Sequence, residues 1–206
     1  MDAVAAVSGK LKERLTACGT ETKIEVIHNG FVQHPQPLEC KKNINRIIQV
    51  GNLIPSKRVD VTICAFAALR EESPDMELVI IGQGPLLGQL KQQYEAMGVT
   101  QAVHFTGQLP NETVFQQLCE SGFFVMASKP EGFGIVYLEA MAAGCVAVGT
   151  EGEGIADIIT HEENGFLVPA DDVDAIVRVI HGCMADRQKM KAIADKGKDT
   201  AAELTW

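Results

Sequence analysis

The stretch "ELVIIG", residues 77–82, decides the fold together with a second run, "GFFVMAS", at residues 122–128. Both are continuous apolar runs that do not alternate between apolar and polar residues, which is typical of short strands buried on both faces. Strands of this kind belong to parallel sheets with helices on each side. The sequence therefore predicts an α/β fold built on a Rossmann-like, doubly wound parallel sheet.

Strand and helix patterns alternate along the rest of the chain. The predicted strands are residues 23–28, 44–51, 78–82, 102–105, 123–126, 145–148 and 166–168. The predicted helices are residues 60–71, 85–97, 112–121, 134–143, 172–184 and 186–204. Strand–helix alternation at this spacing produces βαβ units, which supports the doubly wound sheet.

The first 43 residues have a different pattern. "AVAAVS" followed by "GKLKERLTA" predicts one strand, an N-cap at Ser8 and one helix. An Asn29-Gly30 turn and two prolines then precede the main sheet, which is typical of a hinge. We therefore divide the chain into residues 1–43, a strand–helix piece with a hinge, and residues 44–206, the domain of the main sheet.

The composition disfavours several classes of protein. The chain has 206 residues, of which 46% are hydrophobic and 22% charged, and its net charge is −9. An acidic chain lacks the basic face that nucleic-acid binding requires, so we expect no nucleic-acid partner. The sequence shows no N-terminal signal pattern and no run of about 18 apolar residues, so the expected location is cytoplasmic.

The cysteines and histidines give no metal-binding pattern. The six cysteines are widely spaced, with no C-x-x-C pair and no Cys/His cluster at metal-ligand spacing. Most of them lie in apolar runs and are predicted to be small buried residues in a reducing compartment. The five histidines form no cluster either. We therefore predict no metal site.

Two loops at predicted strand ends are weak candidates for ligand binding, because open parallel sheets bind ligands outside the carboxyl ends of their strands. The first runs from Gly51 to Lys57, and its lysine can meet a phosphate, although a solvated lysine is the commoner case. The second, Gly82-Gln83-Gly84-Pro85, has the spacing G-x-G-x-x-x-G instead of the dinucleotide fingerprint. A tight turn with Pro85 at the first helical position explains it well.

The third loop is "PEGFGIVYLEAMAAG", residues 130–144. Gly132 and Gly134 lie at the start of a predicted helix, whose free N–H groups and dipole favour an anion. One turn further, Glu139 has only apolar neighbours three and four positions away, so its charge needs a binding partner. A phosphate at the helix start, a ribose on Glu139 and a further group on Glu131 fit a nucleotide-diphosphate-sugar.

The same residues also allow a purely structural interpretation, in which Glu131 caps the helix and Glu139 pairs with a core cation. The residues alone favour neither interpretation. Asp172-Val173-Asp174 matches the D-x-D string of some metal-dependent enzymes, but it opens a predicted helix. We therefore expect Asp171 or Asp172 to be an N-cap.

Taken together, these motifs resemble the C-terminal, donor-nucleotide-binding domain of GT-B fold glycosyltransferases of family 4, a large group of retaining enzymes. The resemblance rests on Glu131-Gly132-Phe133-Gly134 and Glu139-Ala140-Met141, which match the family's E-x7-E signature. It also rests on "QVGNLIPSKRVD", "LVIIGQGP", "VHFTGQLP" and "ENGFLVPADD", which occur in family order. It extends from about residue 3 to residue 206.

The resemblance implies a role for each candidate site residue. Glu131 and Lys57 would be catalytic, with Glu131 on the donor sugar and Lys57 neutralising the leaving diphosphate. Glu139 would bind the ribose hydroxyls. The other donor-binding residues would be Gly51, Asn52, Gly82, Gly84, Pro85, Gly107, Gln108, Leu109, Gly132, Phe133, Gly134, Ile135 and Val136. The family needs no catalytic metal, so the nucleotide sugar is a substrate and no cofactor is expected.

The chain departs from the family pattern in sequence and in length. Asn52 stands where the family usually has an arginine that clamps the diphosphate. Near Asp157 the family usually has a glutamate, and this chain has the aspartate, which is one carbon shorter. Family members also carry an N-terminal acceptor-binding domain, of which residues 1–17 resemble only the last strand and helix. The resemblance therefore implies half an enzyme, whose partner is the missing domain. Any membrane contact, at the inner membrane face, would be made through that domain.

Three functions are compatible with the sequence. The first is the donor-binding half of a glycosyltransferase of glycan or polysaccharide biosynthesis, inactive by itself. The second is a non-catalytic module that binds a nucleotide sugar. The third is an NAD-dependent oxidoreductase, which the glycine spacing disfavours. Uridine, guanosine and adenosine are all compatible as the base.

Overall fold

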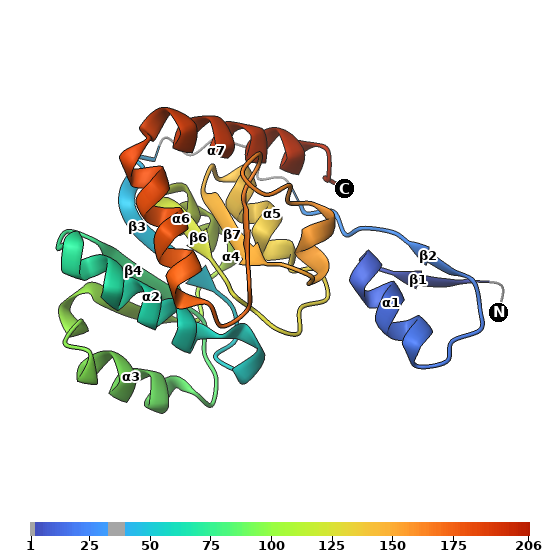
Figure 1. Cartoon of the computed structure of the whole chain (residues 1–206), viewed down its shortest axis with the longest axis horizontal. Coiled ribbons are helices and arrows are strands. Elements are labelled where there is room, and N and C mark those ends of the chain that lie inside the picture. Colours follow the sequence, from blue (N-terminus) through green and yellow to red (C-terminus); the bar gives the residue numbers. More distant parts are fainter. Residues whose placement is uncertain (1–2, 33–39) are drawn as a thin grey trace.

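The computed structural model describes residues 3–32 and 40–206. Its main sheet has six parallel strands in the order β5-β4-β3-β6-β7-β8. These strands are β3 (Asn43–Val50), β4 (Glu77–Ile81), β5 (Val103–Gly107), β6 (Ser121–Val125), β7 (Val146–Thr150) and β8 (Phe166–Val168). The helices are α2 (Val59–Glu72), α3 (Leu87–Ala96), α4 (Asn111–Cys119), α5 (Ile135–Ala142), α6 (Val173–Ala185) and α7 (Arg187–Ala202). They cover both faces of the sheet (Figure 1), which confirms the predicted doubly wound α/β fold.

A smaller unit lies beside the main sheet (Figure 1). It consists of β1 (Val4–Ala6), α1 (Gly9–Ala17) and β2 (Ile24–Val26), with the two strands paired in parallel. Ser8 is the N-cap of α1, as predicted, and its hydroxyl accepts a hydrogen bond from the Leu11 amide at 3.1 Å. Part of the predicted hinge, residues 33–39, lies outside the described residues. The division at residue 43 stays a prediction.

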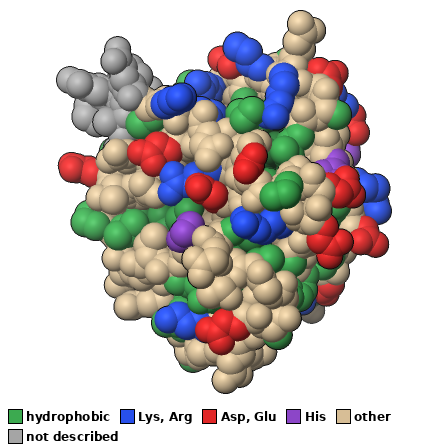
Figure 2. All heavy atoms as spheres, turned by 90° about the vertical axis from the view of Figure 1, so that its left-hand side faces the viewer, with side chains coloured by type: hydrophobic (Ala, Val, Ile, Leu, Met, Phe, Trp, Pro, Cys, Tyr) green, Lys and Arg blue, Asp and Glu red, His purple; other side chains and the backbone are tan. Residues whose placement is uncertain are grey.

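The surface carries charges of both signs. On the face shown in Figure 2, acidic and basic side chains are interspersed, and the described atoms of this face show no continuous basic band. The expectation that nucleic acid is not a partner stays a prediction. In the described part of the chain, no helix is both long enough and apolar enough to cross a membrane.

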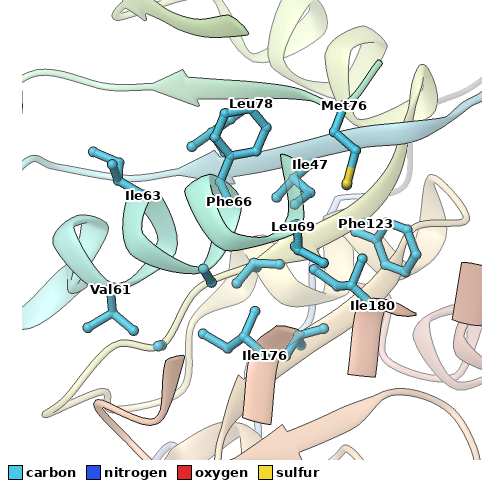
Figure 3. Packing of buried hydrophobic residues seen from close by; sticks show 14 of the residues in the cluster. Ile47, Val61, Ile63, Phe66, Leu69, Met76, Leu78, Phe123, Ile176 and Ile180 are labelled. Carbon is cyan, nitrogen blue, oxygen red and sulfur yellow. The ribbon is translucent and has the colours of Figure 1, made fainter. Parts of the chain in front are cut away.

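The stretch at residues 77–82 is continuously apolar because its strand contributes to two cores. Leu78 and Ile80 pack in the core between the sheet and helices α2, α3 and α6. Val79 and Ile81 pack in the core between the sheet and helices α4, α5 and α7. Figure 3 shows the first core, where Phe66 of α2 lies close to Leu78. Successive strand residues point to opposite faces, so both must be apolar when both faces are covered.

Most predicted element ends differ from the structure by one or two residues, and two of these differences are informative. Helix α3 begins at Leu87 with Leu86 as its N-cap, so the prediction that Pro85 occupies the first helical position is wrong. Helix α4 ends at Cys119, and the chain enters β6 two residues later. Gly122 explains this early strand start, because a Cβ there would lie 2.7 Å from the backbone of β3. The chain can therefore pair with β3 sooner than the apolar pattern suggested.

The D-x-D string is structural, as predicted. Asp172 is the N-cap of α6, and its carboxylate accepts a hydrogen bond from the Ala175 amide at 2.8 Å. Asp171 forms an ion pair with Arg58 at the start of α2. Asp172 thus stabilises the start of α6, and Asp171 joins the segment before it to the start of α2.

The cysteine prediction is wrong for most of the six residues. Cys145 and Cys183 are buried, and burial raises the pKa of the Cys145 thiol to about 11. Cys18 is exposed, and Cys40, Cys64 and Cys119 are partly exposed. Several of these residues lie near the ends or on the outer sides of helices, where an apolar neighbourhood in sequence does not ensure burial.

Candidate functional site

The strand order places the site between two strands. The order of the main sheet reverses between β3 and β6, because the chain moves outward from β3 to β5 and then crosses to β6. In sheets of this kind, ligands bind in the crevice outside the carboxyl ends of the strands at the reversal. The loop after β3, residues 51–58, and the loop after β6, residues 126–134, border that crevice. They contain the candidate residues Lys57 and Glu131.

The structure brings Lys57 and Glu131 together at this point. The Lys57 Nζ donates to Glu131 Oε2 at 2.5 Å, and the Ser128 hydroxyl donates to the same oxygen at 2.9 Å. Only 22% of the Lys57 side chain and 11% of the Glu131 side chain are exposed, so the ion pair is mostly screened from water. A backbone hydrogen bond of 2.7 Å from Lys129 to Ser56 joins the two loops directly.

This arrangement excludes the capping role that was open for Glu131. The N-cap of α5 is Gly134, and no side chain accepts a hydrogen bond at this cap. Gly134 has a φ of 79°, in the left-handed region that favours glycine. The amide groups at the helix start are therefore not covered by a carboxylate cap, and an anion can approach them.

Tyr137 fixes the start of α5 against the sheet. Its ring is fully buried, and its hydroxyl donates to the Met126 carbonyl, just beyond the end of β6. A Cβ on Gly134 would lie 2.7 Å from the Tyr137 ring, so the two residues are in close contact. Burial raises the pKa of the Tyr137 hydroxyl far above its ordinary value, so this group serves as a permanent hydrogen-bond donor.

Glu139 lies on the more accessible side of α5, whereas its apolar sequence neighbours suggested burial. Ile135, one turn before it, is 42% exposed, and Glu139 itself is partly exposed. Tyr137, Leu138, Ala140 and Met141 form the buried side of the helix. A ligand at the helix start can therefore reach Glu139 without displacing the core.

The candidate residues after β3, β4 and β5 are brought together mainly by their backbones. The Gly51 amide donates to Ile81 O, and the Gly82 amide donates to Gly107 O, both at 2.9 Å. A Cβ on Gly82 would lie 1.9 Å from Gly51 O, and a Cβ on Gly84 would lie 2.4 Å from Leu53 O. Close packing between the loops therefore requires glycine at both positions.

Three more candidates lie at the rim of these loops. Gln108 is exposed, and its Oε1 accepts a hydrogen bond from Gln83 Nε2 at 3.0 Å. Asn52 is also exposed, whereas Leu109 is partly buried against the core. The side chains of Gln83 and Gln108 thus connect the loop after β4 to the loop after β5.

The loop after β7 contributes residues that the sequence analysis missed. Glu153 is 4% exposed, and its carboxylate accepts hydrogen bonds from Arg14 at 2.7 and 2.9 Å and from the Glu131 amide at 2.8 Å. The Ser8 hydroxyl donates to Gly132 O at 2.6 Å. The only available signal was a carboxylate between glycines, "EGEG", after a predicted strand. No local pattern could show that α1 would reach it.

The described residues contain no group of three or more His, Cys, Asp or Glu side chains placed to hold a metal ion. The absence of a metal from the reaction stays a prediction.

A parallel sheet with helices on both faces and a reversal of strand order is a Rossmann-like α/β arrangement, and comparison with known proteins gives the family. The sequence profile described as "Glycosyl transferases group 1" matches residues 31–200. The chain therefore belongs to the group 1 glycosyltransferase family.

Two curated relatives illustrate the similarity. An exopolysaccharide phosphotransferase of Streptomyces coelicolor is 32% identical over 74% of this chain, and a GDP-mannose-dependent mannosyltransferase acting on phosphatidylinositol monomannoside, from Mycolicibacterium smegmatis, is 31% identical over 76%. The matches cover 16% and 43% of those proteins. The chain thus spans less than half the length of these relatives.

Solved structures show the same fold. A protein of Anabaena, crystallised in complex with UDP and glucose, matches with a TM-score of 0.87 and 24% identity. The match covers 98% of this chain and 59% of that protein. It supports the assignment of the described domain to one half of a GT-B fold.

Proposed function

We propose that this chain is the donor-binding part of a glycosyltransferase that moves a sugar from a nucleotide-diphosphate-sugar to an acceptor in glycan or polysaccharide biosynthesis. The observation that carries the proposal is the Lys57–Glu131 pair, which lies at the reversal of the sheet beside an uncapped helix start. We further assign the chain to the retaining enzymes of family 4, with Glu131 and Glu139 as the E-x7-E pair. One relative is named as GDP-mannose-dependent, and the similar Anabaena structure contains UDP and glucose. Both ligands support a nucleotide-sugar donor.

Lys57 and Glu131 take the catalytic roles in this proposal. When the bond between the sugar and the diphosphate breaks, negative charge develops on the leaving diphosphate. The Lys57 ammonium stabilises that charge, and the amides of Gly134, Ile135 and Val136 at the start of α5 bind the distal phosphate. Glu131, held by Ser128, contacts the donor sugar. The bound diphosphate then competes with Glu131 for the lysine.

The nucleoside occupies the adjacent loops. Glu139 accepts hydrogen bonds from the two ribose hydroxyls, since it lies on the accessible side of α5 one turn beyond the phosphate. Gly82, Gly84 and Pro85, with the loop at residues 107–109, flank the base and the nucleoside. Asn52 donates a hydrogen bond to the diphosphate without supplying a charge. Lys57 is then the main positive charge that holds the diphosphate.

The acceptor is bound by a further domain in this proposal. The short match to the relatives supports this, because more than half of each relative's length lies outside the matched part. Residues 1–43 would be the end of that domain and the hinge, and a peripheral contact with the inner membrane face would also belong to it. We therefore expect the chain to bind the donor and to transfer no sugar by itself.

The two glutamates provide the test. A thermal-shift screen of UDP, GDP, ADP and their hexose conjugates first identifies the ligand. Titration calorimetry then compares Glu139→Gln and Glu131→Gln, with Glu95→Gln on the exposed end of α3 as the control. Glu139→Gln should weaken the plain nucleoside diphosphate by about 1.5–3 kcal/mol, because a charged acceptor of two hydroxyls is lost.

Glu131→Gln should act differently. It leaves the affinity for the plain diphosphate unchanged or slightly higher, because Lys57 loses its competing carboxylate. It weakens only the sugar-bearing donor. Equal losses for both variants with the sugar-free ligand would contradict the assignment of roles, and a wild-type chain that binds none of the six ligands would contradict the proposed function.

A further inference from the structure

Glu153 connects two parts of the chain that are far apart in sequence. Its carboxylate accepts two hydrogen bonds from the Arg14 guanidinium, which belongs to α1, and one from the backbone amide of Glu131. A nearly fully buried carboxylate is stable only when such partners compensate its charge. The position of the Glu131 amide is therefore coupled to the position of Arg14 through the Glu153 side chain.

Further contacts surround this connection. The Gly154 amide donates to Glu131 O at 3.1 Å, and the Ser8 hydroxyl donates to Gly132 O. A Cβ on Gly154 would lie 1.9 Å from Gly132 O, so the two loops touch through their backbones. Asp157 accepts from the Gly9 amide at 2.5 Å. The unit containing α1 thus rests directly on the loop that leads into α5.

The charge of Glu153 matters for an anionic ligand. The carboxylate lies next to the backbone that leads into the start of α5, and Arg14 compensates its charge. Without Arg14, an uncompensated negative charge would remain beside the site for a diphosphate. The loop would also lose its fixed geometry. Both effects lower the affinity for an anion.

We propose that Glu153 is a positioning residue, through which the α1 unit sets the geometry and the charge of the loop from Glu131 to Gly134. This inference rests on the proposed function, because it assigns a consequence to that loop in donor binding. It predicts that donor affinity depends on α1 through Glu153. A contact that merely holds two parts of the chain together would change stability without changing the loop.

The first test is independent of any ligand. Amide hydrogen exchange is measured for the free protein, the variants Arg14→Met and Glu153→Gln, and the control Lys10→Met. Lys10 lies on the same helix and pairs only locally with Glu13 at 3.2 Å, so its loss changes the charge of α1 without touching the loop. Exchange at residues 131–134 should become at least about tenfold faster in the first two variants and stay unchanged in the control.

The second test uses whichever of UDP, GDP or ADP the wild-type chain binds. Arg14→Met should weaken binding about tenfold, Lys10→Met should not, and Arg14→Lys should recover most of the loss because it restores the positive charge. Arg14→Lys also covers the case in which Arg14→Met fails to fold. Unchanged exchange at residues 131–134 in all variants, or wild-type affinity in Arg14→Met, would overturn the inference. A wild-type chain without nucleotide affinity would instead overturn the proposed function, while the exchange result still decides whether Glu153 positions the loop.

Discussion

The loops after β3 and β4 and the loops after β6 and β7 achieve the same packing by different means. In each pair, a glycine of one loop allows its backbone to touch the other. A Cβ at Gly82 would lie 1.9 Å from Gly51 O, and a Cβ at Gly154 would lie 1.9 Å from Gly132 O. Each pair borders one side of the crevice at the sheet reversal. Close backbone contact is thus common to both.

The two pairs differ in what else holds them. The β3–β4 pair is fixed by backbone hydrogen bonds such as Gly51 N to Ile81 O and Leu53 N to Gln83 O. The β6–β7 pair is fixed in addition by side chains of the N-terminal unit, Ser8 and Arg14. The β3–β4 side of the site is thus held by the loops of the main sheet itself. The other half takes its final geometry from a separate unit.

The largest expected effect comes from breaking the β3–β4 pair. Gly82→Ala introduces a Cβ that would clash with Gly51 O, at a φ of 144° that non-glycine residues rarely adopt. It should lower the free energy of unfolding by about 3 kcal/mol or more, measured in urea. Gly182→Ala in α6 is the control, since the new Cβ would have no atom within 4 Å apart from its chain neighbours and the nearby backbone of its own helix, and it should stabilise the helix by about 0.5–1 kcal/mol. A Gly82→Ala protein as stable as the wild type would contradict the close packing.

A smaller effect is expected from Ser8→Ala, which removes a contact of the β6–β7 pair and leaves the β3–β4 pair intact. The Ser8 hydroxyl caps α1 and also donates a hydrogen bond to Gly132 O. The substitution therefore removes the cap of α1 and the hydrogen bond to Gly132. The free energy of unfolding should fall by about 1–2 kcal/mol, and affinity for the nucleotide should fall with it.

Thr16→Ala is the matched control for this change. Its hydroxyl donates only to Lys12 O within the same helix, and its side chain is exposed. Thermal melts of the two variants should differ clearly. Similar melting temperatures for both would show that the contact with Gly132 contributes nothing.

The sequence predicted the elements that border the site better than the contacts between them, and the range of the sequence signals explains why. Apolar runs and glycine spacing are local signals, and they placed strands, turns and the start of α5 within a few residues. The pairing of Lys57 with Glu131 joins residues 74 apart, and it was not predicted even though both residues were candidates. The strand order that brings them together depends on the whole sheet.

The role of Glu153 was beyond any local pattern. It depends on Arg14, 139 residues earlier, and on where the N-terminal unit lies. For Glu139, the apolar sequence neighbours suggested burial, whereas the residue is partly exposed. Ile135, one turn before it on the same side of α5, is 42% exposed. Apolar residues at a ligand site resemble core residues until the structure shows which side of the helix faces the crevice.

The smallest expected effect concerns divalent cations, and it tests whether the two loop pairs together replace a metal. The β3–β4 pair supplies the charge of Lys57, and the β6–β7 pair supplies the amides at the start of α5. These groups can neutralise a diphosphate electrostatically. Nucleotide affinity in excess EDTA should therefore stay within about threefold of the value in magnesium, a difference well under 1 kcal/mol.

Lys57→Gln provides the comparison for this measurement. Without the lysine, the amides of α5 remain as the anion-binding groups, and binding should weaken and become dependent on magnesium, because the cation then supplies the missing charge. Calorimetric titrations with and without EDTA measure both proteins under the same conditions. A large loss of wild-type affinity in EDTA would indicate that a bound cation, and not Lys57, neutralises the diphosphate. An equally small response in Lys57→Gln would show that the amides of α5 suffice and that the β3–β4 pair contributes no charge to binding.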